Sequence, residues 1–379
     1  MPSLPPPWPG PDSAPAAAPF RLPEAVPYAT PQWPGCGGRF KTLPDDFAVD
    51  EIALYAPSGE GEHLYARLWK RGMTTQQALQ RISEATGVPL RAIGWAGRKD
   101  AQAVTTQWIS LHAPEAPLHQ AESADLRFLE LSRHGNKLRR GHLLGNRFRV
   151  RVRGATLLPH WEELVEFCAR QGFPNLFGPQ RFGAAGRNAE NGRRLLTRLR
   201  GARRVNDAQR FLLHAYQAAL FNSLLARRLT ELGSLGRLLP GDLAVLHRNG
   251  AAFPAAPEAL TDLQARADAR ELSPSAPLFG WRVPLAEGHP GRWEREALAA
   301  ANLTLDAFRF GTKDASLPGE RRAVRAFPAG LSWTPSFDGG EPALELHFTL
   351  APGVYATSLL RELMKTPELD QAPPLDTED

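Results

Sequence analysis

Residues 94–111 read GWAGRKDAQAVTTQWISL, a stretch in which a glycine-rich turn leads into a strand. From Thr105 the residues are β-branched or aromatic, which is typical of a strand. Asp100 lies between the turn and the strand, on a loop at a strand edge, where catalytic groups are often mounted. Two cations precede it and favour its ionised form, and an ionised Asp needs no separate base to act as a nucleophile. The alternative, an ordinary solvated surface carboxylate, is the commoner case for a single Asp in a glycine-rich loop.

Hydrophobic periodicity predicts ordered elements on both sides of this stretch. Strands are expected at 47–52, 63–69 and 344–350, and helices from Thr74 or Thr75 to Gly87 and at 161–171, 207–232 and 356–365. Between about residues 233 and 332 the sequence is rich in Gly, Pro and Ala, which indicates a second, less regular lobe.

Residues 133–154 form a basic stretch, RHGNKLRRGHLLGNRFRVRVRG, without any acidic residue. Arginines alternate with apolar residues from Arg147 to Arg153, which predicts a strand with one buried and one cationic face. Like charges in a row repel each other unless an anion covers them. Because arginine suits phosphate, a nucleic-acid backbone is the expected partner. The alternative is that the arginines pair with acids of the fold.

Composition limits the class of protein. With 379 residues and 42% hydrophobic content, the chain is long enough for two domains. The net charge of +5 is mildly basic. The two cysteines, Cys36 and Cys168, have no metal-ligand or disulfide-framework spacing. Neither a secretory signal nor an apolar membrane-spanning run is visible, so we expect a soluble cytoplasmic protein.

Five stretches, in order along the chain, resemble the TruD family of pseudouridine synthases. The first in importance is AGRKDAQAVTTQW at 96–108, which resembles the family's signature around its nucleophile. The others are PDDF at 44–47, KLRRGHLLGNRF at 137–148, GFPNLFGPQRFG at 172–183 and GVYATSLLREL at 353–363. The resemblance covers roughly residues 36–365.

The resemblance implies an α/β fold of the α+β type. A pseudouridine synthase catalytic domain with a mixed, largely antiparallel sheet would comprise residues 36–172 and 333–367. An inserted TRUD domain would occupy 173–332. Residues 1–35, with a proline at every fourth position from Pro15 to Pro31, are expected to form a poorly ordered extension. Residues 368–379 are expected to form a tail.

The resemblance also implies an activity, the isomerisation of uridine 13 in tRNA without cofactor or metal. Asp100 falls on the catalytic aspartate. The residues that fall on the substrate pocket are Lys41, Phe47, Asn146, Phe148 and Tyr355, where Tyr355 departs from the expected Phe. Phe148 would stack on the flipped base. The arginines expected to contact the RNA backbone are Arg139, Arg140, Arg149, Arg151 and Arg181.

Two other classes of function stay open on the residues alone. A non-catalytic RNA-binding protein would use the basic stretch but would give no reason for the Asp100 loop. A carboxylate-dependent N-glycosidase would use a second acid such as Glu51 or Glu62. The sequence indicates tRNA as partner, with no membrane and no obligate protein partner evident.

Overall fold

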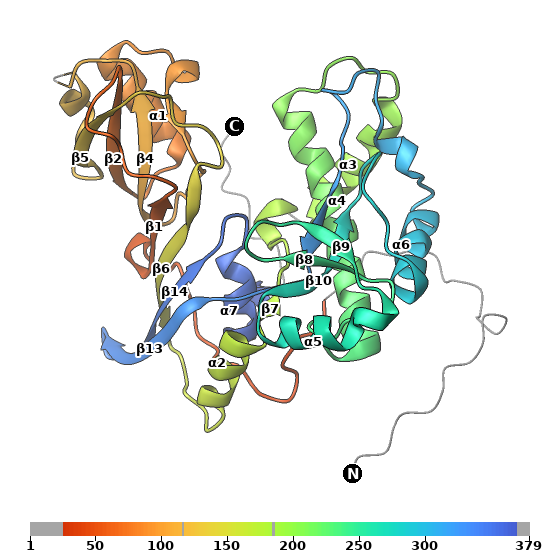
Figure 1. The fold of residues 1–379 in the computed structure, drawn as a ribbon. Helices are drawn as coiled ribbons and strands as arrows, with labels where there is room; N and C mark the ends of the chain where they lie inside the picture. The colour runs from red at the N-terminus through yellow and green to blue at the C-terminus, as the bar shows by residue number, and fades with distance from the viewer. Residues whose placement is uncertain (1–25, 116, 184–185, 370–379) are drawn as a thin grey trace. The chain divides into compact units, whose positions relative to one another are not determined.

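The computed structural model describes residues 26–115, 117–183 and 186–369. The chain divides into two compact units (Figure 1). The sheet unit comprises Tyr28–Gly178 together with the described residues from Ala326 onward. The inserted unit comprises Pro179–Arg325. The sheet unit is therefore discontinuous in sequence.

The sheet unit is built on an eight-stranded mixed sheet with the order β13-β14-β6-β1-β4-β2-β5, in which β3 pairs with β4. Its strands are β1 (Phe47–Ala53), β2 (His63–Arg71), β3 (Gly94–Trp95), β4 (Val104–Leu111), β5 (Leu126–His134), β6 (Leu143–Arg153), β13 (Ala329–Asp338) and β14 (Glu341–Leu350). Only the β1–β4 pairing is parallel among these strands. The predicted fold class, a mixed and largely antiparallel sheet with helices, is confirmed.

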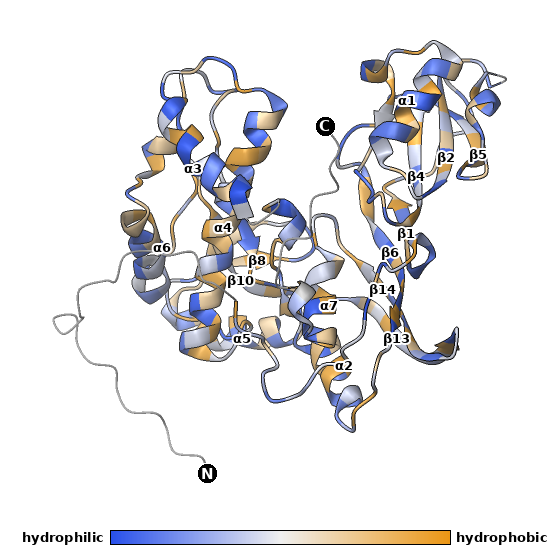
Figure 2. Cartoon of the chain, turned by 180° about the vertical axis from the view of Figure 1, so that it is seen from behind, coloured by the Kyte–Doolittle hydropathy of each residue, from blue (hydrophilic) through white to orange (hydrophobic). Residues whose placement is uncertain are grey.

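Helices cover one face of this sheet. They are α1 (Thr75–Thr86), α2 (Trp161–Arg170) and α7 (Ala356–Met364). Alternate residues of a strand point to opposite faces, and the buried residues of β6 and β14 pack with α2 and α7. Those of β2 and β4 pack with α1 in a second cluster. Figure 2 shows the resulting alternation of hydrophilic and hydrophobic residues along β6 and β14.

Local signals in the sequence account for these elements. The Thr74 side chain accepts a hydrogen bond from the Gln77 amide and so caps α1, while Gly87 ends the helix with a φ of 70°. The predicted strand at 344–350 lies in β14, which pairs with β6 so that Phe348 is opposite Phe148. Residues from the two ends of the chain therefore share one sheet.

The inserted unit is more regular than its composition indicates. It contains α3 (Arg187–Arg198), α4 (Asp207–Leu232), α5 (Leu260–Asp268), α6 (Gly288–Ala300) and a sheet ordered β11-β10-β8-β9. The strands of this sheet are β8 (Leu243–Leu246), β9 (Ala252–Pro254), β10 (Leu272–Leu278) and β11 (Glu320–Ala323). A buried strand was missed because β10 contains Pro274 and Pro277, which normally argue against a strand. A short pair, β7 (Phe173–Pro174) with β12 (Arg325–Ala326), completes the fold.

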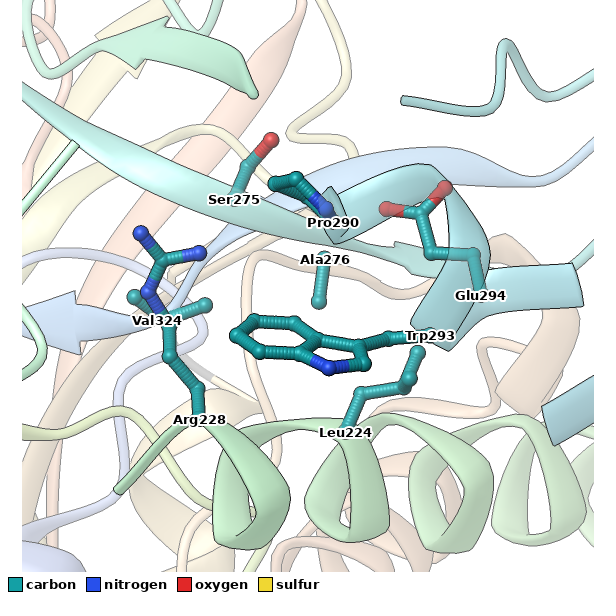
Figure 3. Close-up of a pocket in the computed structure, with 8 residues that line it drawn as sticks. All are labelled: Leu224, Arg228, Ser275, Ala276, Pro290, Trp293, Glu294 and Val324. Carbon is teal, nitrogen blue, oxygen red and sulfur yellow. The ribbon is translucent and has the colours of Figure 1, made fainter. Parts of the chain in front are cut away.

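A small pocket lies inside the inserted unit, between α4, α6 and β10 (Figure 3). Its volume of about 10 Å³ leaves room for about one water molecule. The Trp293 indole lies across it, and the carboxylate of Glu294 beside it is bound by Arg321 at 2.8 Å. We interpret this space as a packing gap around a satisfied buried ion pair.

The expectation of a poorly ordered extension over residues 1–35 is wrong for its last part. Residues 1–25 lie outside the described residues, but Thr30 is fully buried. The Ala29 amide and the Thr30 hydroxyl donate to the carboxylate of Glu362 on α7, at 3.1 and 2.8 Å. Burial raises the pKa of Glu362, and a buried carboxylate needs such donors. The segment is ordered because it supplies them.

Two further observations concern the described residues as a whole. No helix among them is both long and apolar enough to cross a membrane. No cluster of three or more His, Cys, Asp or Glu side chains within the same residues could hold a metal ion. Cys36 and Cys168 are free and buried in the core of the sheet unit.

Candidate active site

Asp100 lies on the loop that joins β3 to β4, with 47% of its side chain exposed. Its Oδ2 accepts a hydrogen bond from Lys41 Nζ at 2.7 Å. The ammonium of Lys41 also lies 4.3 Å from the centroid of the Phe47 ring, at a distance typical of a cation–π contact. Three residues that the sequence places in the site, at positions 41, 47 and 100, are therefore neighbours in space.

A lysine on β2 fixes the backbone of this loop. Lys70 is fully buried, and its Nζ donates to the carbonyl oxygen of Asp100 at 3.0 Å and to that of Met73. Burial lowers the pKa of Lys70 to about 8, and the nearby charge of Asp100 opposes this shift. Lys70 thus holds the main chain of Asp100 in place, while the carboxylate of Asp100 is exposed to solvent.

A second lysine links the loop to two strands. Lys99 Nζ donates to Glu51 Oε2 on β1 at 2.7 Å and to Asn146 Oδ1 on β6 at 2.9 Å. The Lys99 and Glu51 side chains are only 5% and 1% exposed. The second oxygen of Glu51 accepts from the Trp108 amide at 3.2 Å. Since both of its oxygens are engaged, Glu51 is poorly suited to be the second acid of a glycosidase.

An apolar wall adjoins these polar groups. Phe148 is 7% exposed, and its ring stacks on Phe348 with centroids 5.1 Å apart and contacts Phe47 edge-on at 5.9 Å. Strand pairing places Val49 opposite Phe148 and Glu51 opposite Asn146. The wall and the polar groups therefore follow one another along the same face. The role of Phe148 as a stacking platform stays a prediction.

Tyr355 is placed less directly. It precedes α7, is half-buried, and its ring lies 5.7 Å from that of Phe177. It follows Leu350, the last residue of β14, which pairs with Asn146. Among the described residues its hydroxyl has no hydrogen-bond partner. The structure thus places Tyr355 beyond the Asn146 end of β14 and records no contact between it and Asp100.

Three of the four arginines in the row on β6 have acidic partners within the fold. Arg149 lies 3.5 Å from Glu345, Arg151 lies 2.9 Å from Asp338, and Arg153 forms three hydrogen bonds with Asp46. These three arginines therefore need no nucleic-acid anion to balance their charge, whereas Arg147 is exposed and has no acidic partner among the described residues. That Arg149 and Arg151 contact RNA stays a prediction. The pairing depends on the register of β14 against β6 and of β13 against β14, and on the place of Asp46 just before β1, none of which the sequence reveals.

The other arginines predicted to contact RNA are Arg139, Arg140 and Arg181, and their surroundings differ. Arg139 and Arg140 are exposed and have no acidic partner among the described residues. The Arg140 guanidinium lies 4.7 Å from the centroid of the Trp95 ring. Arg181 belongs to the inserted unit, where its guanidinium lies 5.0 Å from the Phe211 ring. Arg139 and Arg140 are thus the strongest remaining candidates for phosphate contacts.

Sequence reasoning missed three residues of this site, Lys70, Lys99 and Glu51, in these positioning roles. In the sequence Lys99 stands out only as a charge beside Asp100, and Glu51 only as an alternative acid. Lys70 is the penultimate residue of β2 and continues the buried row of Leu64, Ala66 and Leu68. A lysine at a predicted core position is the signal that could have identified it, because a buried cation must be bound by polar groups.

The fold is shared with a solved structure. The chain superimposes on the crystal structure of a protein described as "Putative tRNA pseudouridine synthase D (TruD) from Methanosarcina mazei" with a TM-score of 0.73, covering 92% of this chain and 98% of that one at 24% identity. The fold is that of a pseudouridine synthase.

Sequence comparison defines the family. The family described as "tRNA pseudouridine synthase D (TruD)" matches residues 25–198 and 203–363. The tRNA pseudouridine synthase D of Anaeromyxobacter sp. (strain Fw109-5) is 43% identical over 90% of this chain and 98% of its own length. The tRNA pseudouridine synthase D of a Thermus thermophilus strain is 39% identical over 90% of this chain and 92% of its own length. The chain belongs to the TruD family of pseudouridine synthases.

Proposed function

We propose that the protein converts uridine 13 of tRNA to pseudouridine, with Asp100 as the catalytic carboxylate. The reaction breaks the C1′–N1 bond, turns the detached base and forms a C1′–C5 bond; N1 gains a proton and C5 loses one. The observation that carries the proposal is the exposed carboxylate of Asp100, paired with Lys41 at 2.7 Å in a chain of this family.

The surrounding groups suit such a reaction. A nucleotide must leave the RNA stack before a carboxylate can reach its sugar or base. A flipped base needs an apolar surface and a polar group that reads its edge. Phe148 and Asn146, at adjoining positions on one strand face, offer these two properties. Asp100 would attack the sugar or the base, or remove the C2′ proton.

The direct test is carbodiimide mapping of tRNA after incubation with the protein. We expect one new modified position with the wild-type protein and none with Asp100→Asn, while tRNA affinity stays nearly unchanged. Asp125→Asn is the matched control, because Asp125 is another half-exposed carboxylate paired with an arginine. Unmodified RNA with the wild-type protein would support a binding protein, and released uracil would support an N-glycosidase.

A further inference from the structure

A buried ion pair fixes one side chain of the proposed substrate pocket. Lys99 and Glu51 are almost fully buried, and the carboxylate of Glu51 is held by both Lys99 and the Trp108 amide. The Lys99 ammonium thus keeps one position, from which it also reaches the Asn146 side chain at 2.9 Å.

The chemistry of lysine decides which way the Asn146 amide faces. An ammonium has three donors and no acceptor, whereas an asparagine amide has an oxygen acceptor and a nitrogen donor. The atom that faces Lys99 must therefore be the oxygen, and the Nδ2 group must face away. Nδ2 has no partner among the described residues, and it is not one of their buried unpaired polar atoms. It remains available as a donor.

We propose that Lys99 and Glu51 act as positioning residues that present Asn146 to the substrate base only as a hydrogen-bond donor, so that the site selects a base with carbonyl groups. This inference rests on the proposed function. A donor matches the carbonyl oxygens of uracil at C2 and C4. It does not match the amino group that cytosine carries at C4.

The donor group of Asn146 can bind the base both before and after the base turns. Turning the uracil ring about the axis through N3 and C6 exchanges N1 with C5 and also exchanges the two carbonyl groups. A single donor therefore meets a carbonyl oxygen both before and after the turn. Cytosine has one carbonyl, so it would present its amino group to Asn146 in one of the two orientations.

Sulfur substitution at the target nucleotide tests this contact. Substrate tRNAs carry uridine, 2-thiouridine or 4-thiouridine at the position that the wild-type protein modifies, and kcat/KM is measured for each. Sulfur accepts hydrogen bonds weakly, so we expect the wild-type protein to be about three- to tenfold slower on both thio-substrates, the range that loss of one hydrogen bond gives. In Asn146→Ala the contact is absent, so kcat/KM should no longer fall by this factor when sulfur replaces oxygen.

The Asn146→Asp variant reverses the polarity at nearly constant shape. One carboxylate oxygen keeps the contact with Lys99, and the other faces the base as an acceptor that repels a carbonyl. We expect Asn146→Asp to be less active on uridine than Asn146→Ala, with unchanged thermal stability and tRNA affinity. A purely structural role of Asn146 predicts the opposite order, because Asp preserves the packing better than Ala.

The role of the ion pair is tested in the double variant Lys99→Met, Glu51→Gln, which removes both charges together and keeps an acceptor for the Trp108 amide. Asn146 is still present, but its amide is no longer held. The fall in kcat/KM from the uridine substrate to the thiouridine substrates, here called the thio-penalty, should therefore be smaller than in the wild-type protein. Thio-penalties that are equal in the wild-type protein and Asn146→Ala would overturn the proposal. Absence of pseudouridine from the uridine substrate would instead overturn the proposed function.

Discussion

Lys41 Nζ lies 2.7 Å from Asp100 Oδ2, and Lys41 itself has a left-handed backbone with a φ of 56°. Few residues other than glycine adopt this conformation readily. The side chain is thus delivered to Asp100 from a constrained turn rather than from a helix or strand.

Because glycine adopts a positive φ freely, the Lys41 side chain can be removed without straining the backbone. Lys41→Gly removes the side chain without straining the turn, so we expect the melting temperature to change little, since exposed ion pairs contribute about 0.2–1 kcal/mol. We expect kcat to fall by about tenfold or more, a barrier increase of at least about 1.4 kcal/mol. Arg270→Gly is the control, another cation with positive φ, which is exposed and lies in the inserted unit, whereas Lys41 is half-buried. Equal activity of both variants would remove Lys41 from the site.

Lys70 should make stability depend on pH. Its pKa is about 8 in the folded protein, against 10.5 as the ordinary value. The unfolded chain therefore binds more protons between these values, so the free energy of unfolding should rise with pH from 8 to 10.5. The rise relative to Lys70→Met should be on the order of 3 kcal/mol. Urea denaturation at pH 7.5 and 9.5 should detect about 2 kcal/mol of this rise, because part of it lies above pH 9.5. Lys137→Met is the control, because Lys137 also donates to a main-chain carbonyl but at an exposed site.

The two sets of arginines should differ in the salt dependence of tRNA binding. Arg139→Ala and Arg140→Ala should each reduce the slope of log K against log salt by about one, as expected for a lost phosphate contact. Arg151→Ala should leave the slope unchanged, because its partners are Asp338 and Glu345. A slope that falls with Arg151→Ala as well would restore this residue to the RNA interface.

Phe148 and Phe348 form a matched pair for testing the stacking role. Both are buried in one core with rings 5.1 Å apart, so Leu in place of either should cost similar stability. If Phe148 carries the base, Phe148→Leu should lower kcat/KM and Phe348→Leu should not, once both are measured well below their melting temperatures. The platform assignment fails if the two variants lose activity equally.

Much of the sheet unit could be predicted from local patterns. The Thr74 cap and the Gly87 stop are short-range signals, and the alternation at 344–350 requires a sheet partner. The register between strands could not be predicted, because it depends on packing between distant segments. For that reason the pairing of Arg151 with Asp338 and the contact of Lys99 with Asn146 were both invisible in the sequence.

The discontinuity of the sheet unit has a consequence for how such a chain tolerates changes in length. Phe173, shortly before the inserted unit, and Ala326, directly after it, are buried in the same core, and their strands pair. The chain therefore leaves and re-enters the sheet unit at neighbouring points. Every strand of the main sheet lies outside residues 179–325, so the order and pairing of those strands do not depend on how long the inserted segment is.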